Sequence, residues 1–284
     1  MGEPAPIQIL PPVAIDRTRI VDLLDRIEHV DEAATGALVF GPAARPVGTV
    51  LVEDGRICWA VTAGMNRRLT DLLRAQTSPP LSAEAIQQVY QKCRNDDVPL
   101  GEALVVSGLV TPDGLRAALR EHTAEAIGHL SELPTVACAW NPHKNRRYDA
   151  RYTFSPAEIL IALESRNQPG LTETIQEDLE QVMAPGSLGF CFARATPYPM
   201  LLAAVGAERL GAREIAGLGR WTIDMLDLRQ AIDANADIMS FSTRAGTAAC
   251  AWNTGRVVTV VLCEDESSLI YTIVRRRRIL RGET

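Results

Sequence analysis

The chain lacks most of the features that mark enzymes and membrane proteins. Histidine occurs four times and aromatic residues make up 5% of the 284 residues, so general bases and stacking platforms are scarce. No Walker A or G-x-S-x-G pattern is present, and no G-x-G-x-x-G spacing follows a strand. The sequence therefore offers no nucleophile–base pair and no phosphate-binding loop, and it predicts no catalytic or cofactor-binding residues.

Long apolar runs and a targeting segment are also missing. No stretch approaches the ~18 apolar residues of a membrane span. The first residues, MGEPAPIQILPP, have no basic region and no apolar core of a signal peptide. The six cysteines form no C-x-x-C pair and mostly lie in apolar, strand-like segments, as buried reduced thiols do. We therefore expect a cytoplasmic protein without a membrane span.

Positive charge is limited as well. The net charge is −6, the only lysines are Lys92 and Lys144, and neither the first 165 residues nor the remainder is net basic. Nucleic-acid binding normally requires a basic field. Nucleic acid is therefore excluded as an expected partner.

What the sequence does contain is a clear succession of strands and helices. VGTVLVE and RICWAV read as strands joined at Asp54-Gly55, which supplies the positive φ angles of a type I′ turn. Apolar residues at helical spacing predict helices around Ile20–Ile27 and Leu69–Leu73 and within 81–130, where Thr111 is the expected N-cap. Ser155, Pro156 and Glu158 mark the start of another helix. The expected fold class is α+β with two domains, 1–166 and 167–284, separated at the turn-rich SRNQPGLTE.

The first domain resembles the PATAN-type domain of bacterial signalling proteins. TGALVF, VGTVLVEDGRICWA and YDARYTFSPAEILIAL carry the resemblance, which covers roughly residues 15–165. Its helical segment 81–130 is expected to be an insertion, and PLGEALVVSGLVTPDGLRAAL resembles the N-terminal domain of pilus and secretion ATPases. Some members of that second family bind cyclic di-GMP through two tandem motifs with Arg before Leu-Gly. This chain has one motif, with Pro99 in that place, so a cyclic-dinucleotide sensor is the alternative to a helical packing unit.

The second domain is similar to the roadblock/LC7 family over about 170–282. Its expected order is α-β-β-α-β-β-β-α, with a long helix near 212–234 and a last helix capped by Ser267. The resemblance implies a non-enzymatic module that dimerises through its long helix and third strand and regulates small Ras-like GTPases.

The long helix has apolar residues in two directions, and Gly217 and Gly219 leave room for a close approach by another backbone. A dimer or partner interface is expected at Ile215, Leu218, Trp221, Met225, Leu228 and Ile232. A single wide core stripe on a monomer is the alternative interpretation.

Three other sets of residues are considered as a metal site, a reactive thiol and a charged contact surface. His122, Glu125 and His129 share a helix at i, i+3 and i+7, but no further ligand has suitable spacing, so a solvated face is favoured and no metal is expected. Cys58 beside Trp59 has no histidine near it in sequence and reads as a core thiol. The arginines at 275–278 either complement a helix C-terminus or contact an acidic partner or anionic lipid; the candidate contact residues are Arg275, Arg276, Arg277 and Arg278.

These observations predict a non-enzymatic cytoplasmic signalling adaptor. We expect it to form a homodimer and to bind a protein partner, either a small Ras-like GTPase or a response-regulator system.

Overall fold

The structure is a computed structural model in which two antiparallel sheets and their helices form a mixed α+β fold. The chain divides into two compact units, with a boundary between Phe154 and Ser155. The residues described are 8–13, 24, 35–42, 45–65, 67–76, 81–96, 100–133, 136–142, 148–167, 170–194, 199–207, 210–233, 237–242 and 247–283.

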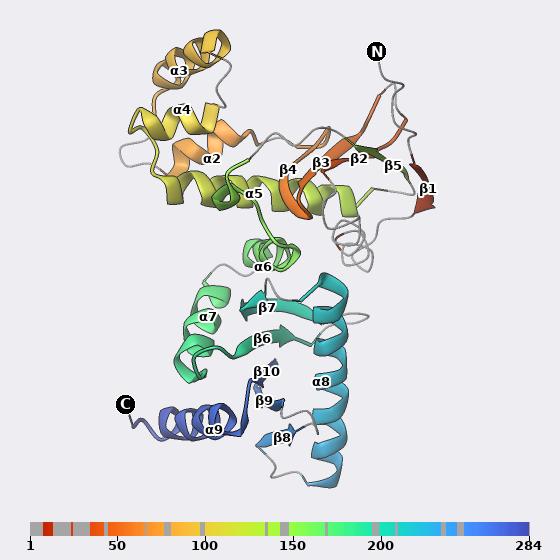
Figure 1. Cartoon of the computed structure of the whole chain (residues 1–284), viewed down its shortest axis with the longest axis vertical. Helices are drawn as coiled ribbons and strands as arrows, with labels where there is room; N and C mark the ends of the chain where they lie inside the picture. Colours follow the sequence, from red (N-terminus) through yellow and green to blue (C-terminus); the bar gives the residue numbers. More distant parts are fainter. Residues whose placement is uncertain are drawn as a thin grey trace. The chain divides into compact units, whose positions relative to one another are not determined.

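The first unit is built on an antiparallel sheet with strand order β1-β5-β2-β3-β4 (Figure 1). Its strands are β1 (Gln8–Val13), β2 (Gly36–Phe40), β3 (Gly48–Glu53), β4 (Arg56–Thr62) and β5 (Val136–Pro142). Asp54 and Gly55 connect β3 to β4 with φ angles of 52° and 74°. The type I′ turn predicted from these two residues is therefore confirmed.

Helices accompany this sheet and form a cluster of their own. They are α2 (Leu69–Gln76), α3 (Ala83–Asp96), α4 (Leu100–Val106), α5 (Pro112–Ser131) and the short 3₁₀ turn η1 (Ala150–Tyr152). The first half of α5 packs with α2–α4 through Leu115 and Ala118, and α5 also packs along β4. The segment expected as an insertion is thus divided between a helical cluster and the layer that covers the sheet.

The second unit contains an antiparallel sheet with strand order β7-β6-β10-β9-β8. Its strands are β6 (Leu188–Ala193), β7 (Met200–Val205), β8 (Ile238–Ser242), β9 (Ala248–Thr254) and β10 (Val257–Cys263). Its helices are α6 (Pro156–Asn167), α7 (Leu171–Val182), α8 (Ala212–Ile232) and α9 (Glu266–Leu280). From α7 onward the elements follow the order α-β-β-α-β-β-β-α that the sequence predicted.

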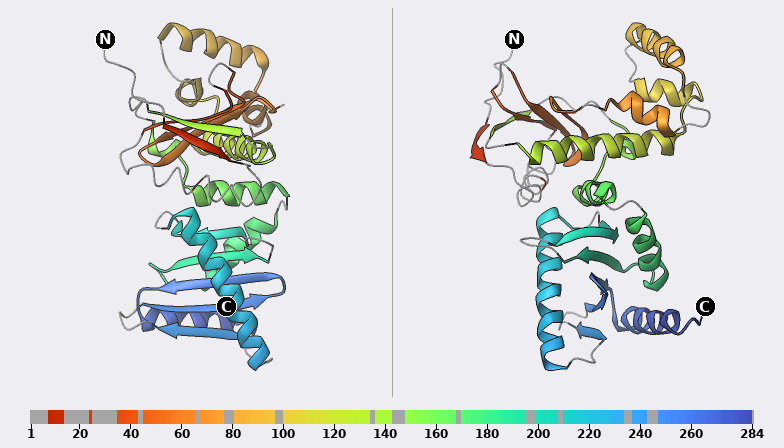
Figure 2. Two further views of the ribbon diagram at one scale, coloured as in Figure 1. Left: turned by 90° about the vertical axis from the view of Figure 1, so that its right-hand side faces the viewer. Right: turned by 180° about the vertical axis from the view of Figure 1, so that it is seen from behind.

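The helices of the second unit cover opposite faces of its sheet. Ile175 and Leu179 of α7 share one core cluster with Leu269 and Ile273 of α9. Residues of α6 and α8 share the other cluster with Phe190 and Phe192. In the right-hand view of Figure 2, α8 lies on one side of the sheet and α7 and α9 lie on the other.

Helix starts follow the capping signals with one correction. Thr111 caps α5 by accepting a 3.0 Å hydrogen bond from the Gly114 N–H. Ser155 and Glu158 form the expected reciprocal pair at the start of α6. The last helix, however, is capped by Asp265 and not by Ser267, because the Asp265 carboxylate accepts a 2.7 Å hydrogen bond from the Ser268 N–H.

The division of the chain also differs from the boundary expected at residues 166–167. Helix α6 precedes the turn-rich segment, but Ala157, Leu160 and Ile161 pack into the core of the second sheet. Turn-forming residues mark a loop, whereas unit membership is decided by where an apolar helix face is buried. The helix expected around Ile20–Ile27 lies outside the described residues, apart from Leu24, which is buried.

Candidate functional site

Helix α8 presents two apolar faces on opposite sides of its axis. The inner face packs on the second sheet and includes Ile215 and Leu226, which are 1% and 4% exposed. Leu218 and Ile223 are partly buried against the same cluster. Because Ile215 and Leu218 contact the chain's own core, they leave the set of residues expected at an interface with another molecule.

The other four residues of that expected set form a continuous stripe on the outer face. Trp221, Met225, Leu228 and Ile232, spaced by four, three and four residues, lie on one side of the helix. Trp221, Leu228 and Ile232 are 41%, 56% and 74% exposed. Large apolar side chains gathered on one face in this way are typical of protein-interaction sites. We call these four residues the outer stripe.

The two glycines of α8 serve different faces. A Cβ at Gly219 would lie 2.8 Å from the Phe192 ring, so this glycine permits the helix to approach its own sheet. A Cβ at Gly217 would meet nothing within 4 Å. Gly217 precedes Trp221 by four residues and therefore extends the outer stripe with a position that has no side chain.

Strand β8 continues the surface beside the outer stripe. It is an edge strand that pairs with β9, and no strand pairs with its outer edge in the part of the chain that the structure describes. The ring of Phe241 meets the ring of Trp221 edge to face, with centroids 4.9 Å apart. The sequence analysis missed Phe241, although it alternates with Met239 at the two-residue period that places both on the α8 side of the sheet.

Polar contacts tie α8 to the sheet that it covers. Arg194, at the end of β6, donates to both carboxylate oxygens of Asp227 at 2.7 and 2.9 Å. The same guanidinium donates to the side-chain oxygen of Asn253 at 3.1 Å. Charge-assisted hydrogen bonds are short and strong, so these contacts help to set which side of α8 faces outward.

The arginine run on α9 does not act as one group. Arg276 is 7% exposed, lies 5.0 Å from the centre of the Trp252 ring and is 3.4 Å from an Asp237 carboxylate oxygen. It is therefore removed from the expected set of acidic-partner contacts. Arg277 and Arg278 are exposed, whereas Arg275 is half-buried and donates to the Gln181 carbonyl.

The cysteines are arranged as core residues. All six are free and buried. Burial raises the pKa of Cys58 to about 12, with Glu53 adding to the shift, and raises that of Cys250 to about 12. Burial likewise raises the pKa of Cys191 to about 11. Since the thiolate is the nucleophilic form, these thiols are poorly suited to catalysis.

The histidine group on α5 is a packing feature. His122 is buried and stacks on Trp59, with ring centroids 4.2 Å apart and planes 16° apart. Glu125 is also buried, whereas His129 is half-exposed with its Nε2 3.9 Å from a Glu125 oxygen. Within the described residues, no three His, Cys, Asp or Glu side chains are grouped so as to hold a metal ion.

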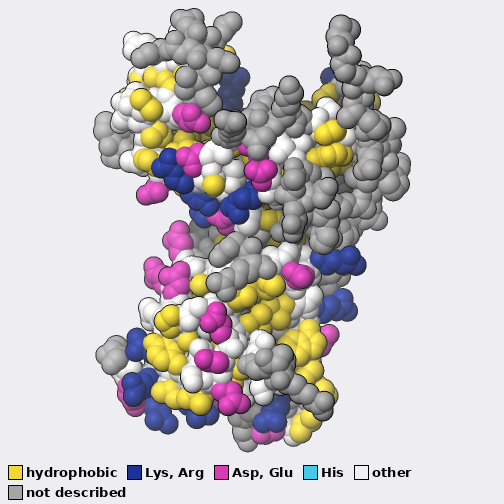
Figure 3. All heavy atoms as spheres, viewed as in Figure 1, with side chains coloured by type: hydrophobic (Ala, Val, Ile, Leu, Met, Phe, Trp, Pro, Cys, Tyr) yellow, Lys and Arg dark blue, Asp and Glu magenta, His cyan; other side chains and the backbone are white. Residues whose placement is uncertain are grey.

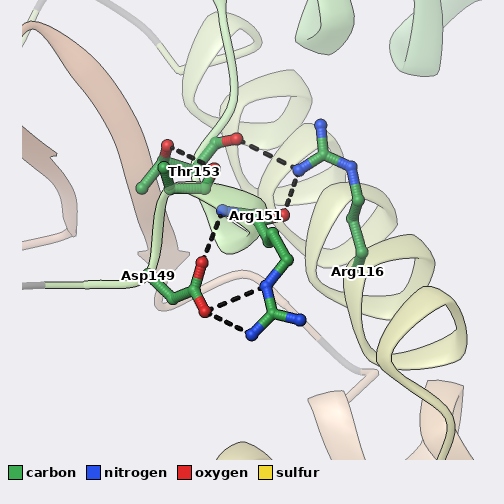
Figure 4. Close-up of polar contacts among 5 residues, drawn as sticks. Arg116, Asp149, Arg151 and Thr153 are labelled. Carbon is green, nitrogen blue, oxygen red and sulfur yellow. Dashed lines mark hydrogen bonds and ion pairs between the residues drawn. The ribbon is translucent and has the colours of Figure 1, made fainter.

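An arginine cluster joins α5 to the segment that ends the first unit (Figure 4). Arg116 donates to the backbone carbonyls of Arg151 and Thr153, and its guanidinium lies 4.9 Å from the centre of the Phe154 ring. Asp149 accepts bonds of 3.0 and 2.6 Å from the Arg151 side chain, and these bonds lower the pKa of Asp149. The cluster holds backbone in place, and its Asp149 carboxylate is engaged by the Arg151 side chain.

The motif behind the cyclic-dinucleotide alternative also has a packing role. A Cβ at Gly101 would lie 3.0 Å from Leu115, so the glycine after Leu100 allows α4 to lie close to α5. Leu104 and Leu115 belong to the apolar core of the α2–α5 cluster. Pro99, where related motifs carry arginine, lies outside the described residues. These contacts agree with a helical packing unit.

Comparisons of the sequence with known proteins add no family to this description. No family model matches the chain, and a search of curated proteins finds no match. No helix among the described ranges combines the length and apolarity needed to cross a membrane.

Proposed function

We propose that this chain is a non-enzymatic cytoplasmic signalling adaptor that forms a homodimer through α8 and β8. The outer stripe, adjoining the free edge of β8, is the observation that carries the proposal. A two-fold axis beside these elements sets one stripe against its copy, as an isologous interface requires. The element order of the second unit supports the roadblock/LC7 resemblance, which implies the same pair of interface elements.

The partner of the dimer is proposed as a small Ras-like GTPase or a response-regulator system. This part of the proposal rests on the resemblance of the two halves of the chain to roadblock/LC7 and PATAN-type signalling domains. The buried cysteines and the stacked His122 support a role in contact rather than catalysis.

The dimer is tested by light scattering on the full chain with a charge placed in the stripe. Leu228→Asp buries a carboxylate in the proposed interface, and at about 500 mM NaCl, where contacts between exposed charges are screened, we expect a monomer at concentrations where the unchanged chain is a dimer. Ala231→Asp is the matched control, because it adds the same charge at an exposed position of α8 outside the stripe. A chain that stays monomeric at about 100 µM, which corresponds to less than about 6 kcal/mol of association, contradicts the proposal.

The partner is tested separately with the dimeric chain as bait in extract of the native cell. We expect a GTPase or a response regulator to be retained, and Leu228→Asp reports whether its capture requires the dimer. Retention of neither class by a chain that light scattering shows to be dimeric contradicts the partner assignment and leaves the dimer in place.

A further inference from the structure

The face of the second unit opposite α8 carries two exposed charge sets of opposite sign. It is formed by α7 and α9, which pack side by side on the second sheet. Figure 3 shows acidic side chains over α7 and arginine side chains over α9. We call the exposed surface of these two helices the charged face.

Helix α9 supplies the basic half of the charged face. Its inner side is made by Leu269, Thr272, Ile273 and Arg276, which are buried or packed against the sheet. The outer side begins with apolar residues and ends in arginines. The exposed members are Ile270, Tyr271, Val274, Arg277 and Arg278, with Arg281 directly after the helix, and Arg275 beside them is half-buried. No acidic residue interrupts the helix after Glu266.

Helix α7 supplies the acidic half. Ile175, Leu179 and Val182 face the core. The outer side has four exposed carboxylates and no basic residue. The acidic residues are Glu173, Glu177, Asp178 and Glu180.

The two charge sets do not neutralise each other within one chain. Arg275 donates a 3.3 Å hydrogen bond to the carbonyl of Gln181, and Glu180 accepts one of 2.7 Å from Gln176. No ion pair joins α7 to α9 among the residues described, although the helices are neighbours. Both sets therefore remain available to a partner with the reverse arrangement.

We propose that the charged face binds the charged face of a second copy of this chain. A two-fold axis between α7 and α9 places the carboxylates of each α7 opposite the arginines of the other copy's α9. The same arrangement covers Ile270, Tyr271 and Val274, which are 60%, 49% and 44% exposed. A flat anionic membrane would meet the arginines but also four carboxylates beside them, so the charge pattern favours a second copy.

This interface is independent of the dimer proposed through α8. Helices α7 and α9, which carry the charged face, lie on the opposite side of the sheet from α8, which carries the outer stripe (Figure 2). A chain that uses both faces has two different isologous contacts, and alternation of the two extends an assembly beyond a dimer. The charged contact depends on exposed ions and is therefore expected to be the more sensitive of the two to salt.

The test uses full-length variants carrying Leu228→Asp, so that association through the outer stripe does not contribute. We expect residual self-association in sedimentation velocity to weaken about tenfold between about 50 mM and about 500 mM NaCl. Arg277→Glu with Arg278→Glu is expected to abolish it at low salt, and so is Glu177→Arg with Glu180→Arg. Arg213→Glu with Arg220→Glu, on exposed positions of α8, is the matched control. It changes the net charge by the same amount as the reversal of Arg277 and Arg278 and should have no effect on association.

The decisive measurement restores the match between opposite charges by combining the two kinds of charge-reversed chain. A mixture of the arginine-reversed and glutamate-reversed chains is expected to form heterodimers, and a chain with both reversals should associate with itself. Recovery of association also shows that the reversed chains are folded. A Leu228→Asp chain that is monomeric at low salt, or a mixture that stays monomeric, overturns the proposal.

A second experiment tests whether the charged face binds an anionic membrane and not a second copy of the chain. Flotation with phosphatidylserine vesicles is expected to leave the unchanged chain in solution. Vesicle binding that is lost on reversal of Arg277 and Arg278, without salt-sensitive self-association, assigns the charged face to a membrane and overturns the proposal.

Discussion

Helices α5 and α8 lie in similar places and have different surroundings. They contain 20 and 21 residues, and each packs on a five-stranded antiparallel sheet, α5 mainly along β4 and α8 along β9 and β10. Ten residues of α5 are buried, including His122 and Glu125, whereas six residues of α8 are buried. Helices α2 and α4 pack against α5, and the outer stripe of α8 has no such cover among the described residues. In the first unit, other helices of the same chain cover part of α5. For α8, a second molecule is proposed to provide the corresponding cover.

The largest expected effect is a loss of folding stability when a side chain is shortened between α5 and the helices that pack on it. Leu115 is 1% exposed between α5 and its helical cluster, so Leu115→Ala should destabilise the first unit by about 2–5 kcal/mol through loss of packing and a residual cavity. Leu228→Ala, on the uncovered side of α8, should change the stability of the monomer by less than about 0.5 kcal/mol. Urea unfolding of both variants under dilute conditions makes the comparison, and equal effects would remove the distinction between the two helices.

The next effect concerns association through the outer stripe. Trp221 is a large, half-exposed ring held edge-on by Phe241, and buried tryptophans dominate interface energies. Trp221→Ala should weaken dimerisation by about 2 kcal/mol, which is roughly thirtyfold in the dissociation constant. Analytical ultracentrifugation across a dilution series measures the constant. An unchanged constant would place the dimer interface elsewhere.

Replacing the two glycines of α8 by alanine is expected to change the stability of the chain in opposite directions, because they lie on different faces of the helix. Gly219→Ala forces a methyl group against the Phe192 ring and should cost about 1–3 kcal/mol of stability. Gly217→Ala enters open space and should stabilise the monomer by roughly 0.5–1 kcal/mol through helix propensity. Thermal unfolding at low concentration measures both. Shifts of the same sign would contradict the assignment of the two faces.

The smallest expected effect is a pH dependence of folding stability caused by His122 on α5. Burial lowers the pKa of His122 below its ordinary value of 6.5, although Glu125 and the Ala60 backbone oppose the shift. The unfolded chain then binds this proton more readily, so stability falls as the pH drops below about 6.5 and is retained above it. His122→Phe keeps an aromatic ring against Trp59 and removes the titration. Urea midpoints measured above and below that pH should therefore differ less in the variant than in the unchanged chain.

Local sequence signals determined much of this structure because they act over a few residues. Asp54-Gly55 adopts the positive φ angles of its turn, Thr111 and Ser155 cap their helices, and the second unit has the predicted order of elements. The two-sided apolar pattern of α8 could also be read directly, since helical periodicity defines which residues share a face.

Tertiary structure decided which apolar face of α8 is covered, and so it separated Ile215 and Leu218 from the outer stripe. It also placed α6 in the second unit, buried Arg276 against Trp252 and brought Phe241 to Trp221. Each of these outcomes depends on contacts between residues far apart in the chain. Periodicity within one helix specifies its faces, but only packing against a sheet selects the face that remains exposed.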